Sequence, residues 1–259
     1  RMGMAIISVI ASSPEAKLTG ALEREDSPLL GRDAGEAAAA GKLGVKITDK
    51  PDRAFRKADV IIDFTVPEAA VSTLELAAER RISMVIGTTG FSHHQRDLIK
   101  ELSQKMRIVM APNMSIGVNL LLKLVSLSAR ILGSDYDIEI VEAHHRHKKD
   151  APSGTAIRIA EVAAAAVERD LEKVAVYERK GIIGERKPEE IGIQTVRAGD
   201  IVGDHTVIFG GIGERIELVH KASSRATFAM GAIKAALWLS DKPHGLYDMQ
   251  DVLGFKADA

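Results

Sequence analysis

The stretch EAHHRHKKDAPSGTA, from Glu142 to Ala156, brings three histidines and three basic residues together within six positions. The preceding residues 136–142, YDIEIVE, alternate between polar and apolar side chains, which predicts a strand with one buried face. Beyond Asp150, apolar residues recur at helical spacing, which predicts a helix over residues 152–169. The histidines therefore lie between the end of a strand and the start of a helix.

This junction has the chemical groups of an anion-binding and proton-transfer site. Free N–H groups at a helix N-terminus attract anions, and Gly154 lets a ligand approach the backbone without a Cβ in the way. Histidine exchanges protons close to neutral pH. Histidines and a lysine facing such a terminus indicate a small carboxylated substrate.

Two other interpretations of the same residues stay open at this point. A basic run is often a solvated face or a nucleic-acid patch. A metal site is the second alternative, because His144 and His147 are three residues apart. In an extended segment, however, they fall on opposite faces, and few acids lie nearby as further ligands. We therefore expect no metal.

Composition narrows the class of protein. The chain has 259 residues, with 35 Lys and Arg against 36 Asp and Glu, and its net charge of −1 argues against nucleic acid as the main partner. It contains no cysteine, which excludes disulfides and thiolate chemistry and is compatible with a reducing cytoplasm. We find no apolar run near the roughly 20 residues that span a bilayer and no signal-peptide pattern. The expectation is a cytoplasmic protein without a membrane partner.

Strands and helices alternate in the first part of the chain. Strands are predicted at residues 60–63, 84–86 and 108–110, with helices at 67–80 and 92–105 between them. Short unbroken apolar strands separated by helices are typical of a parallel sheet covered on both faces. Ligands of such sheets bind beyond the carboxyl ends of the strands. Polar turns are expected at these ends, at Glu23, Thr65, Gly87 to Thr89 and Ala111 to Met114.

The first residues have the spacing of a dinucleotide-binding motif. A helix is predicted at residues 4–10 and a strand at 17–22, which ends in Glu23 and Arg24. Dinucleotide folds place an acid about 20 residues beyond a glycine-rich turn, and Gly3 to Glu23 fits this distance. Glu23 can accept hydrogen bonds from the ribose of NAD, and Arg24 can pair with the 2′-phosphate of NADP. The alternative is an exposed carboxylate at a strand end.

The pattern changes after Asn113. A helix at 116–132 is followed by the strand before the histidines and by further strands at 174–177, 191–197, 206–209 and 214–221. Because strand follows strand, we expect a mixed or antiparallel sheet, whose edges pair or pack between subunits of a homo-oligomer. The predicted fold class is α/β: a Rossmann-type parallel-sheet domain (1–115 and 225–259) and a second α+β domain (116–224) for substrate binding and oligomerisation.

The chain resembles the 4-hydroxy-tetrahydrodipicolinate reductase family, also called dihydrodipicolinate reductases, of bacterial lysine and diaminopimelate biosynthesis. The resemblance covers nearly the whole chain, and the histidine stretch is its most specific part. Arg1-Met2-Gly3 looks like the end of the family's GxxGRMG loop, and the family's first strand and first glycines are absent from this sequence. The other matching segments are ALERE (21–25), DFT (63–65), GTTGF (87–91), the 111–114 turn, VRAGDIVG (196–203), HKASSR (220–225) and ALWL (236–239).

The resemblance implies a reaction and a set of site residues. The reaction is the reduction of 4-hydroxy-tetrahydrodipicolinate to tetrahydrodipicolinate by NADH or NADPH with loss of water, in a homotetramer. His144 would donate or accept a proton and Lys148 would donate one. The substrate carboxylates would bind to His145, Ser153, Gly154 and Thr155. The cofactor would bind along Arg1, Met2, Glu23, Arg24, Gly87, Thr88, Thr89, Ala111, Pro112, Asn113 and Met114.

Two alternative functions accompany this interpretation. One is another NAD(P)-dependent reductase of a small carboxylated substrate, with the same architecture and a different pocket. The other is a Rossmann-type nucleotide sensor whose basic stretch binds RNA or an acidic partner. The predicted helix start at residues 153–155 favours the enzymes, because a basic RNA-binding face does not need it.

Overall fold

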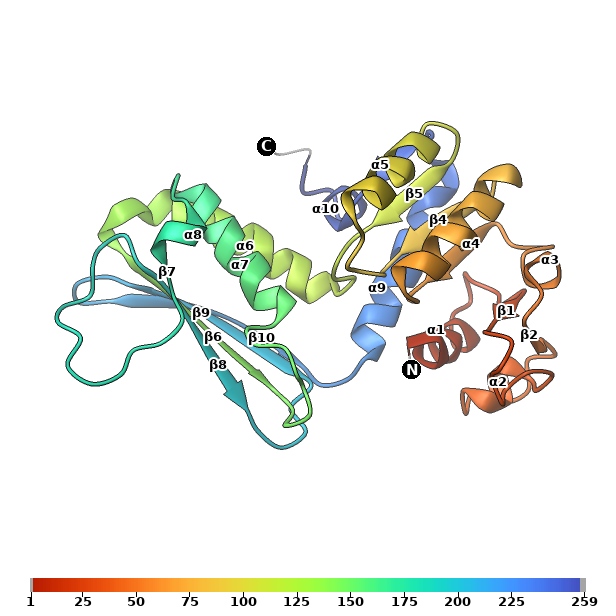
Figure 1. The fold of residues 1–259 in the computed structure, drawn as a ribbon, viewed down its shortest axis with the longest axis horizontal. Coiled ribbons are helices and arrows are strands. Elements are labelled where there is room, and N and C mark those ends of the chain that lie inside the picture. Colours follow the sequence, from red (N-terminus) through yellow and green to blue (C-terminus); the bar gives the residue numbers. More distant parts are fainter. Residues whose placement is uncertain (1, 257–259) are drawn as a thin grey trace. The chain divides into compact units, whose positions relative to one another are not determined.

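The computed structural model describes residues 2–256, which form two compact units (Figure 1). The first unit contains the chain up to Ile116 and again from Arg225 onward, and the second contains Gly117–Ser224. The first unit holds a parallel sheet and the second a mixed sheet, which confirms the predicted fold class.

The sheet of the first unit is parallel and buried on both faces. Its strand order is β11-β5-β4-β3, with β3 at Val60–Asp63, β4 at Ser83–Ile86, β5 at Arg107–Met110 and β11 at Gly245–Tyr247. Met84 and Ile86 pack with α4 (Pro67–Glu79) and α5 (His93–Leu102), while Val85 packs with α9 (Ala226–Trp238) and α10 (Met249–Val252). This alternation explains why β4 is apolar at nearly every position. All the strands end at one edge, where the predicted turns begin.

The predicted strand at 17–22 differs from the structure. It is reduced to β1 (Ala21–Leu22), which pairs in parallel with β2 (Ile47–Thr48) as a separate two-stranded sheet. Three helices belong to the same region: α1 (Met2–Ala11), α2 (Ala34–Ala37) and α3 (Pro51–Ala54).

The second unit is built on a five-stranded mixed sheet of order β10-β9-β6-β8-β7. β9 and β10 run antiparallel, as do β6 and β9, whereas β6, β8 and β7 are parallel. The strands are β6 (Asp137–His144), β7 (Ala175–Val176), β8 (Ile191–Arg197), β9 (Gly203–Gly210) and β10 (Arg215–Ala222). The sheet is therefore mixed, as predicted.

Helices cover one face of this sheet (Figure 1): α6 (Ile116–Leu132), α7 (Gly154–Ala166) and α8 (Leu171–Val174). Ile138 and Ile140 of β6 face α6 and α7 in the core, and Glu139 between them faces the other side. Helix α7 starts at Gly154, two residues later than predicted, because the Ser153 hydroxyl accepts a hydrogen bond from Ala156 N and caps the helix. The histidine stretch thus connects the end of β6 to the start of α7.

The helical segment Ile116–Asp135 has the length and apolar composition of a membrane span, which the sequence-based expectation overlooked. Core helices of globular proteins meet the same criterion. Leu121, Val125 and Ala129 of this helix lie in the core of the second unit.

Candidate active site

A row of polar side chains crosses the sheet of the second unit beside the start of α7. Glu142 on β6 lies opposite Thr195 on β8 and His205 on β9, and His205 lies opposite His220 on β10. His144 shares this face, because residues two apart on a strand point the same way. The sheet register therefore brings the histidine stretch together with residues more than fifty positions away.

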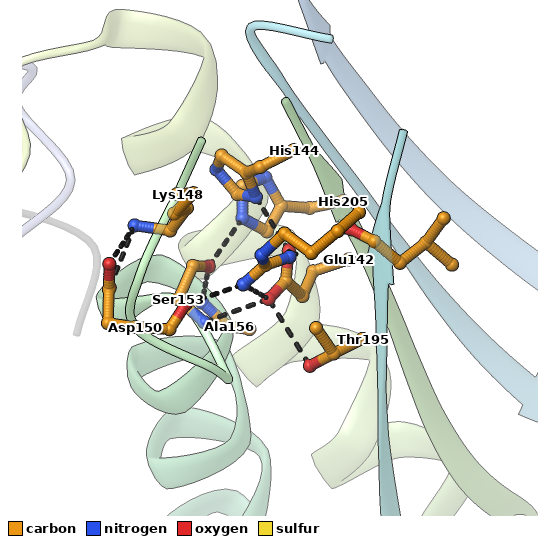
Figure 2. A network of polar contacts seen from close by, with 10 residues as sticks. Glu142, His144, Lys148, Asp150, Ser153, Ala156, Thr195 and His205 are labelled. Carbon is orange, nitrogen blue, oxygen red and sulfur yellow. Dashed lines mark hydrogen bonds and ion pairs between the residues drawn. The ribbon is translucent and has the colours of Figure 1, made fainter. Parts of the chain in front are cut away.

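The carboxylate of Glu142 is the centre of this row and is completely buried (Figure 2). Its Oε2 lies 2.6 Å from His144 Nδ1 and 2.9 Å from Arg197 Nη1. Its Oε1 accepts hydrogen bonds from Ser153 N at 2.9 Å, Arg197 Nη2 at 2.9 Å and Thr195 Oγ1 at 3.3 Å. Burial by itself raises the pKa of Glu142, but the hydrogen bonds from Arg197, His144 and Ser153 outweigh it and lower the pKa. Glu142 is therefore a carboxylate anion.

The imidazole of His144 is held on three sides. Glu142 binds Nδ1, and the ring of His205 meets the ring of His144 edge to face, with 5.3 Å between centroids. Gly203 on β9 makes room for the other nitrogen, since a Cβ there would lie 3.0 Å from His144 Nε2. The ring is thus fixed, and Nε2 is the nitrogen that does not bind Glu142.

His205 is a buried neutral histidine. Its Nε2 lies 3.2 Å from Ser153 Oγ, and only 4% of the residue is exposed. Burial lowers the pKa of His205 from 6.5 to about 4, and repulsion from His144 adds to the effect. His205 therefore supports the capping serine without carrying a charge at neutral pH.

The lowered pKa of His205 predicts acid sensitivity of the fold. Between pH 6.5 and about 4 the unfolded chain binds a proton at this position and the folded chain does not, so the free energy of unfolding falls as the pH falls. From about pH 7 to about pH 5, we expect this group to contribute a loss of roughly 2 kcal/mol. His205→Gln removes the titration and keeps a polar atom near Ser153, so its unfolding free energy should fall less.

Urea unfolding followed by circular dichroism at both pH values measures the difference. The single tryptophan, Trp238, lies in the first unit, so fluorescence would report on the other half of the molecule. Equal acid losses in the two proteins would contradict the neutral state of His205.

Lys148 and His145 lie in the segment that links β6 to α7. Lys148 Nζ bonds both carboxylate oxygens of Asp150, at 2.9 and 2.7 Å, and this contact lowers the pKa of Asp150 (Figure 2). The Nδ1 atom of His145 is buried and has no hydrogen-bond partner within the described residues. At Gly154 the position of a missing Cβ has no atom within 4 Å, so that side of the helix start is open. The structure thus places the predicted proton-transfer and carboxylate-binding residues around one turn.

The first unit carries the predicted cofactor-binding turns. Asp63, at the end of β3, accepts hydrogen bonds from Thr65 N at 2.9 Å, Thr65 Oγ1 at 2.7 Å and Thr88 Oγ1 at 2.9 Å. This buried carboxylate ties the turn after β3 to the turn after β4. A Cβ on Gly87 would overlap the ring of Phe64, so only glycine fits there. Because Thr88 Oγ1 donates to the buried Asp63, the side chain of Thr88 points inward. The backbone of this turn is then left to contact a ligand.

The turn after β5 is also built around backbone contacts. Ala111 and Met114 are buried, and Asn113 Oδ1 accepts a hydrogen bond from Ser115 N at 2.9 Å. Gly231 on α9 allows the helix to approach the carbonyl of Met114, because a Cβ would overlap that oxygen. Pro112 lies on the exposed side of the turn. Of this predicted group, the backbone and Pro112, rather than the buried side chains of Ala111 and Met114, can contact a cofactor.

The turn after β1 carries both an acidic residue, Glu23, and a basic residue, Arg24. Glu23 N donates to Thr48 O, and Arg24 N donates to Glu23 Oε2, each at 3.0 Å. Arg24 Nε pairs with Asp26 Oδ1 at 2.9 Å, and both side chains are exposed. Met2 starts α1, and Arg1 lies outside the described residues. A helix start, a carboxylate and an exposed guanidinium form a donor and acceptor set that fits a nicotinamide dinucleotide.

Several residues of the site were missed in the sequence. Glu142 could have been found, because it lies two residues before His144 in a predicted strand and so shares its face. Arg197, Thr195 and His205 had no local signal, since their contacts depend on the pairing of β8 and β9 with β6.

A parallel α/β unit with such turns, in one chain with a histidine and lysine site at a helix start, defines a two-domain NAD(P)H-dependent oxidoreductase. Comparison with known proteins identifies the family. The family models described as dihydrodipicolinate reductase, N-terminus and C-terminus, match residues 1–114 and 117–253.

Individual relatives agree with the family models. The 4-hydroxy-tetrahydrodipicolinate reductase of Hahella chejuensis is 55% identical over 256 residues, which cover 99% of this chain and 96% of the relative. That of Syntrophus aciditrophicus is 53% identical over 257 residues, with the same coverage. The dipicolinate-bound dihydrodipicolinate reductase of Paenisporosarcina sp. TG-14 superposes with a TM-score of 0.75 at 25% identity, covering 96% of this chain and 94% of that one. A probable dehydrogenase of Thermotoga maritima, at 10% identity and TM-score 0.63 over 97% of this chain and 90% of that one, shows the fold alone.

The chain therefore belongs to the dihydrodipicolinate reductase family. Its activity is the NAD(P)H-dependent reduction of 4-hydroxy-tetrahydrodipicolinate, with loss of water, in diaminopimelate and lysine biosynthesis. The function predicted from the sequence is confirmed.

Proposed function

We propose that His144 exchanges a proton with the substrate, that Lys148 donates one, and that the start of α7 binds the substrate carboxylates. The observation that carries this proposal is the 2.6 Å contact between His144 Nδ1 and the buried Glu142 carboxylate, which directs an imidazole to the turn before α7. A carboxylate partner of this kind fixes the tautomer and the orientation of a histidine. Reduction of a conjugated cyclic imine requires a hydride and a proton, and bound NAD(P)H supplies the hydride.

The carboxylate-binding part rests on the open side of the helix start. Gly154 and Thr155 occupy the first turn of a 13-residue helix, where backbone N–H groups and the helix dipole favour an anion. The buried Nδ1 of His145 is a further polar atom for this anion. Ser153 uses its N–H for Glu142 and its hydroxyl for Ala156, so its role is to shape the turn. The dipicolinate bound in the Paenisporosarcina relative, a cyclic dicarboxylate, supports a substrate of this class.

The cofactor-binding part includes both NADH and NADPH. The adenosine end binds at the start of α1, with Arg1 and Met2, and at Glu23 and Arg24. The backbone of the turns Gly87–Thr89 and Ala111–Met114 holds the nicotinamide end, at the carboxyl ends of β4 and β5. The half-buried Glu23 and the exposed Arg24 support dual use, because one side chain suits a ribose hydroxyl and the other a 2′-phosphate.

Glu23→Ala tests this division of labour. Loss of a hydrogen bond to a charged group costs about 1.5–3 kcal/mol, so we expect the Kd for NADH to rise roughly tenfold or more. The Kd for NADPH should change little, because its phosphate gains nothing from a carboxylate. Titration of each nucleotide by fluorescence measures both constants. Glu25→Ala, which removes the next carboxylate of the same turn, is the matched control, and equal losses for NADH and NADPH in Glu23→Ala would count against the proposal.

A homotetramer built on the second unit is also part of the proposal. Helices lie on one face of its sheet, and the opposite face carries the half-exposed apolar side chains Val196 and Val219. Pairing of such faces between copies would bury them. Light scattering of the purified chain should give the mass of a tetramer, and a monomer at all concentrations would contradict it.

The complete reaction is tested by mixing the enzyme with the fresh condensation product of pyruvate and aspartate semialdehyde. Absorbance of the reduced nicotinamide should fall with NADH and with NADPH. If the protein binds NADH but does not oxidise it when the condensation product is added, the assigned substrate is wrong.

A further inference from the structure

Glu142 bonds two different parts of the site with its two oxygens. Oε2 contacts the imidazole of His144, and Oε1 accepts the backbone N–H of Ser153, the N-cap of α7. The carboxylate lies on the sheet face that packs against α7, and it has no exposed surface. One rigid group therefore links the proton-transfer residue to the carboxylate-binding turn.

The hydrogen-bond donors around Glu142 decide which ring nitrogen of His144 carries a proton. The Ser153 N–H and the two Arg197 nitrogens can only donate hydrogen bonds, so both carboxylate oxygens act as acceptors. A nitrogen 2.6 Å from Oε2 must then carry its proton, because a bare Nδ1 would face a negative oxygen. His144 therefore has its proton on Nδ1, and when the ring is neutral, Nε2 is the basic nitrogen.

Other charged groups around this pair leave the assignment unchanged. Arg197 on β8 provides the cation that balances Glu142, and its fork also donates to the carbonyl of Asp150. His205 on β9 is neutral at working pH, and Thr195 on β8 is uncharged. In the segment before α7, Lys148 is paired with Asp150. Arg197 is thus the group that keeps Glu142 an anion in a buried position.

We propose that Glu142, held by Arg197, is the positioning residue of this active site. It sets the tautomer and the ring orientation of His144. It also fixes the position of the carboxylate-binding turn relative to that ring. The inference deepens the proposed function and rests on the role of His144 stated there.

Glu142→Gln is the decisive substitution, because the amide must replace one acceptor oxygen by a donor nitrogen. At the Oε1 position this nitrogen would face the Ser153 N–H and an Arg197 N–H, neither of which can become an acceptor. At the Oε2 position it would face only one such donor, Arg197 Nη1, and it can donate to His144, provided that the histidine moves its proton from Nδ1 to Nε2. The variant therefore inverts the tautomer of His144 while nearly preserving the shape of the side chain.

We expect Glu142→Gln to lower kcat by roughly 10–100-fold, less than complete loss of the imidazole would, with NADH affinity unchanged. Nitrogen NMR of labelled histidine should show the proton of neutral His144 on Nε2 instead of Nδ1. A purely structural role would leave the tautomer unchanged.

The chain offers a matched control on the same strand. Glu139 is also clamped by arginines, Arg179 and Arg186, but it faces the opposite side of the sheet. Glu139→Gln makes the same chemical change under similar restraint and should leave kcat within about twofold. Glu142→Asp serves if Glu142→Gln does not fold: it keeps the charge but withdraws it from His144, and it should lower kcat about tenfold.

The outcomes separate this inference from the proposed function. If His144→Gln retains activity, the proton-transfer role itself is wrong. If His144→Gln is inactive while folded Glu142→Gln keeps its turnover and tautomer, only the positioning role is overturned. Wild-type turnover in Glu142→Asp would overturn it as well. The double variant should lose no more kcat than His144→Gln alone, because Glu142 acts on proton transfer through that histidine, whereas its bond to the turn before α7 affects the KM for the substrate.

Discussion

Replacing His144 by glutamine is expected to lower kcat by about 10²–10⁴-fold, the usual contribution of a positioned acid or base. Glutamine can still contact Glu142, so the buried carboxylate keeps a partner and the turn into α7 keeps its shape. It cannot exchange a proton near neutral pH. Steady-state kinetics with saturating NADH measures the loss, and NADH titration shows whether the first unit is intact.

His147→Gln is the matched control for this substitution. His147 belongs to the same stretch but is exposed. The kcat of His147→Gln should therefore stay within about threefold of that of the unmodified enzyme. If His144→Gln lost NADH binding and kept its turnover per bound cofactor, the histidine stretch would not be the chemical site.

Lys148→Ala is expected to lower kcat by about 10²-fold or more, because the proposed acid and its positive charge are both removed. The contact with both oxygens of Asp150 fixes the direction of the Lys148 ammonium group. The neighbouring Lys149 therefore cannot take its place. Lys148→Arg separates the two functions of the side chain. Arginine keeps the charge and the contact with a carboxylate but does not give up a proton, so it should be nearly as inactive as alanine.

Lys149→Ala, at the exposed neighbouring lysine, provides the reference. Its turnover should be close to that of the unmodified enzyme. Substantial activity in Lys148→Arg would mean that Lys148 acts only through its charge, and this would contradict its assignment as proton donor.

The main elements of the second unit could be predicted because their signals are local. The alternation in residues 136–142 predicts β6, and the capping serine with the apolar spacing beyond it predicts α7. Shorter elements were missed or misjudged. The strand β11 (Gly245–Tyr247) and the helices α2 and α3 have only three or four residues, which is too short for a periodic pattern. The strand at 17–22 was predicted too long, because its apolar residues partly pack in loops around β1.

The register of the mixed sheet lay outside any local pattern. His144 lies opposite Arg197, and Glu142 lies opposite His205, but 53 and 63 residues separate these pairs along the chain. A slip of one residue in either pairing would turn Arg197 or His205 to the opposite face. Without that pairing, Glu142 would be a buried charge with no cation beside it.

The sequence alone therefore determined the family, the alternation of strands and helices, and the candidate residues for substrate binding and proton transfer. These features depend on residue type and on spacing over a few positions. Only the tertiary structure decided which distant groups support those residues: Arg197 bonds the carboxylate of Glu142, and the ring of His205 contacts the ring of His144. The physical reason is that the tautomer and direction of a histidine depend on neighbours in space, and here strand pairing and burial select those neighbours.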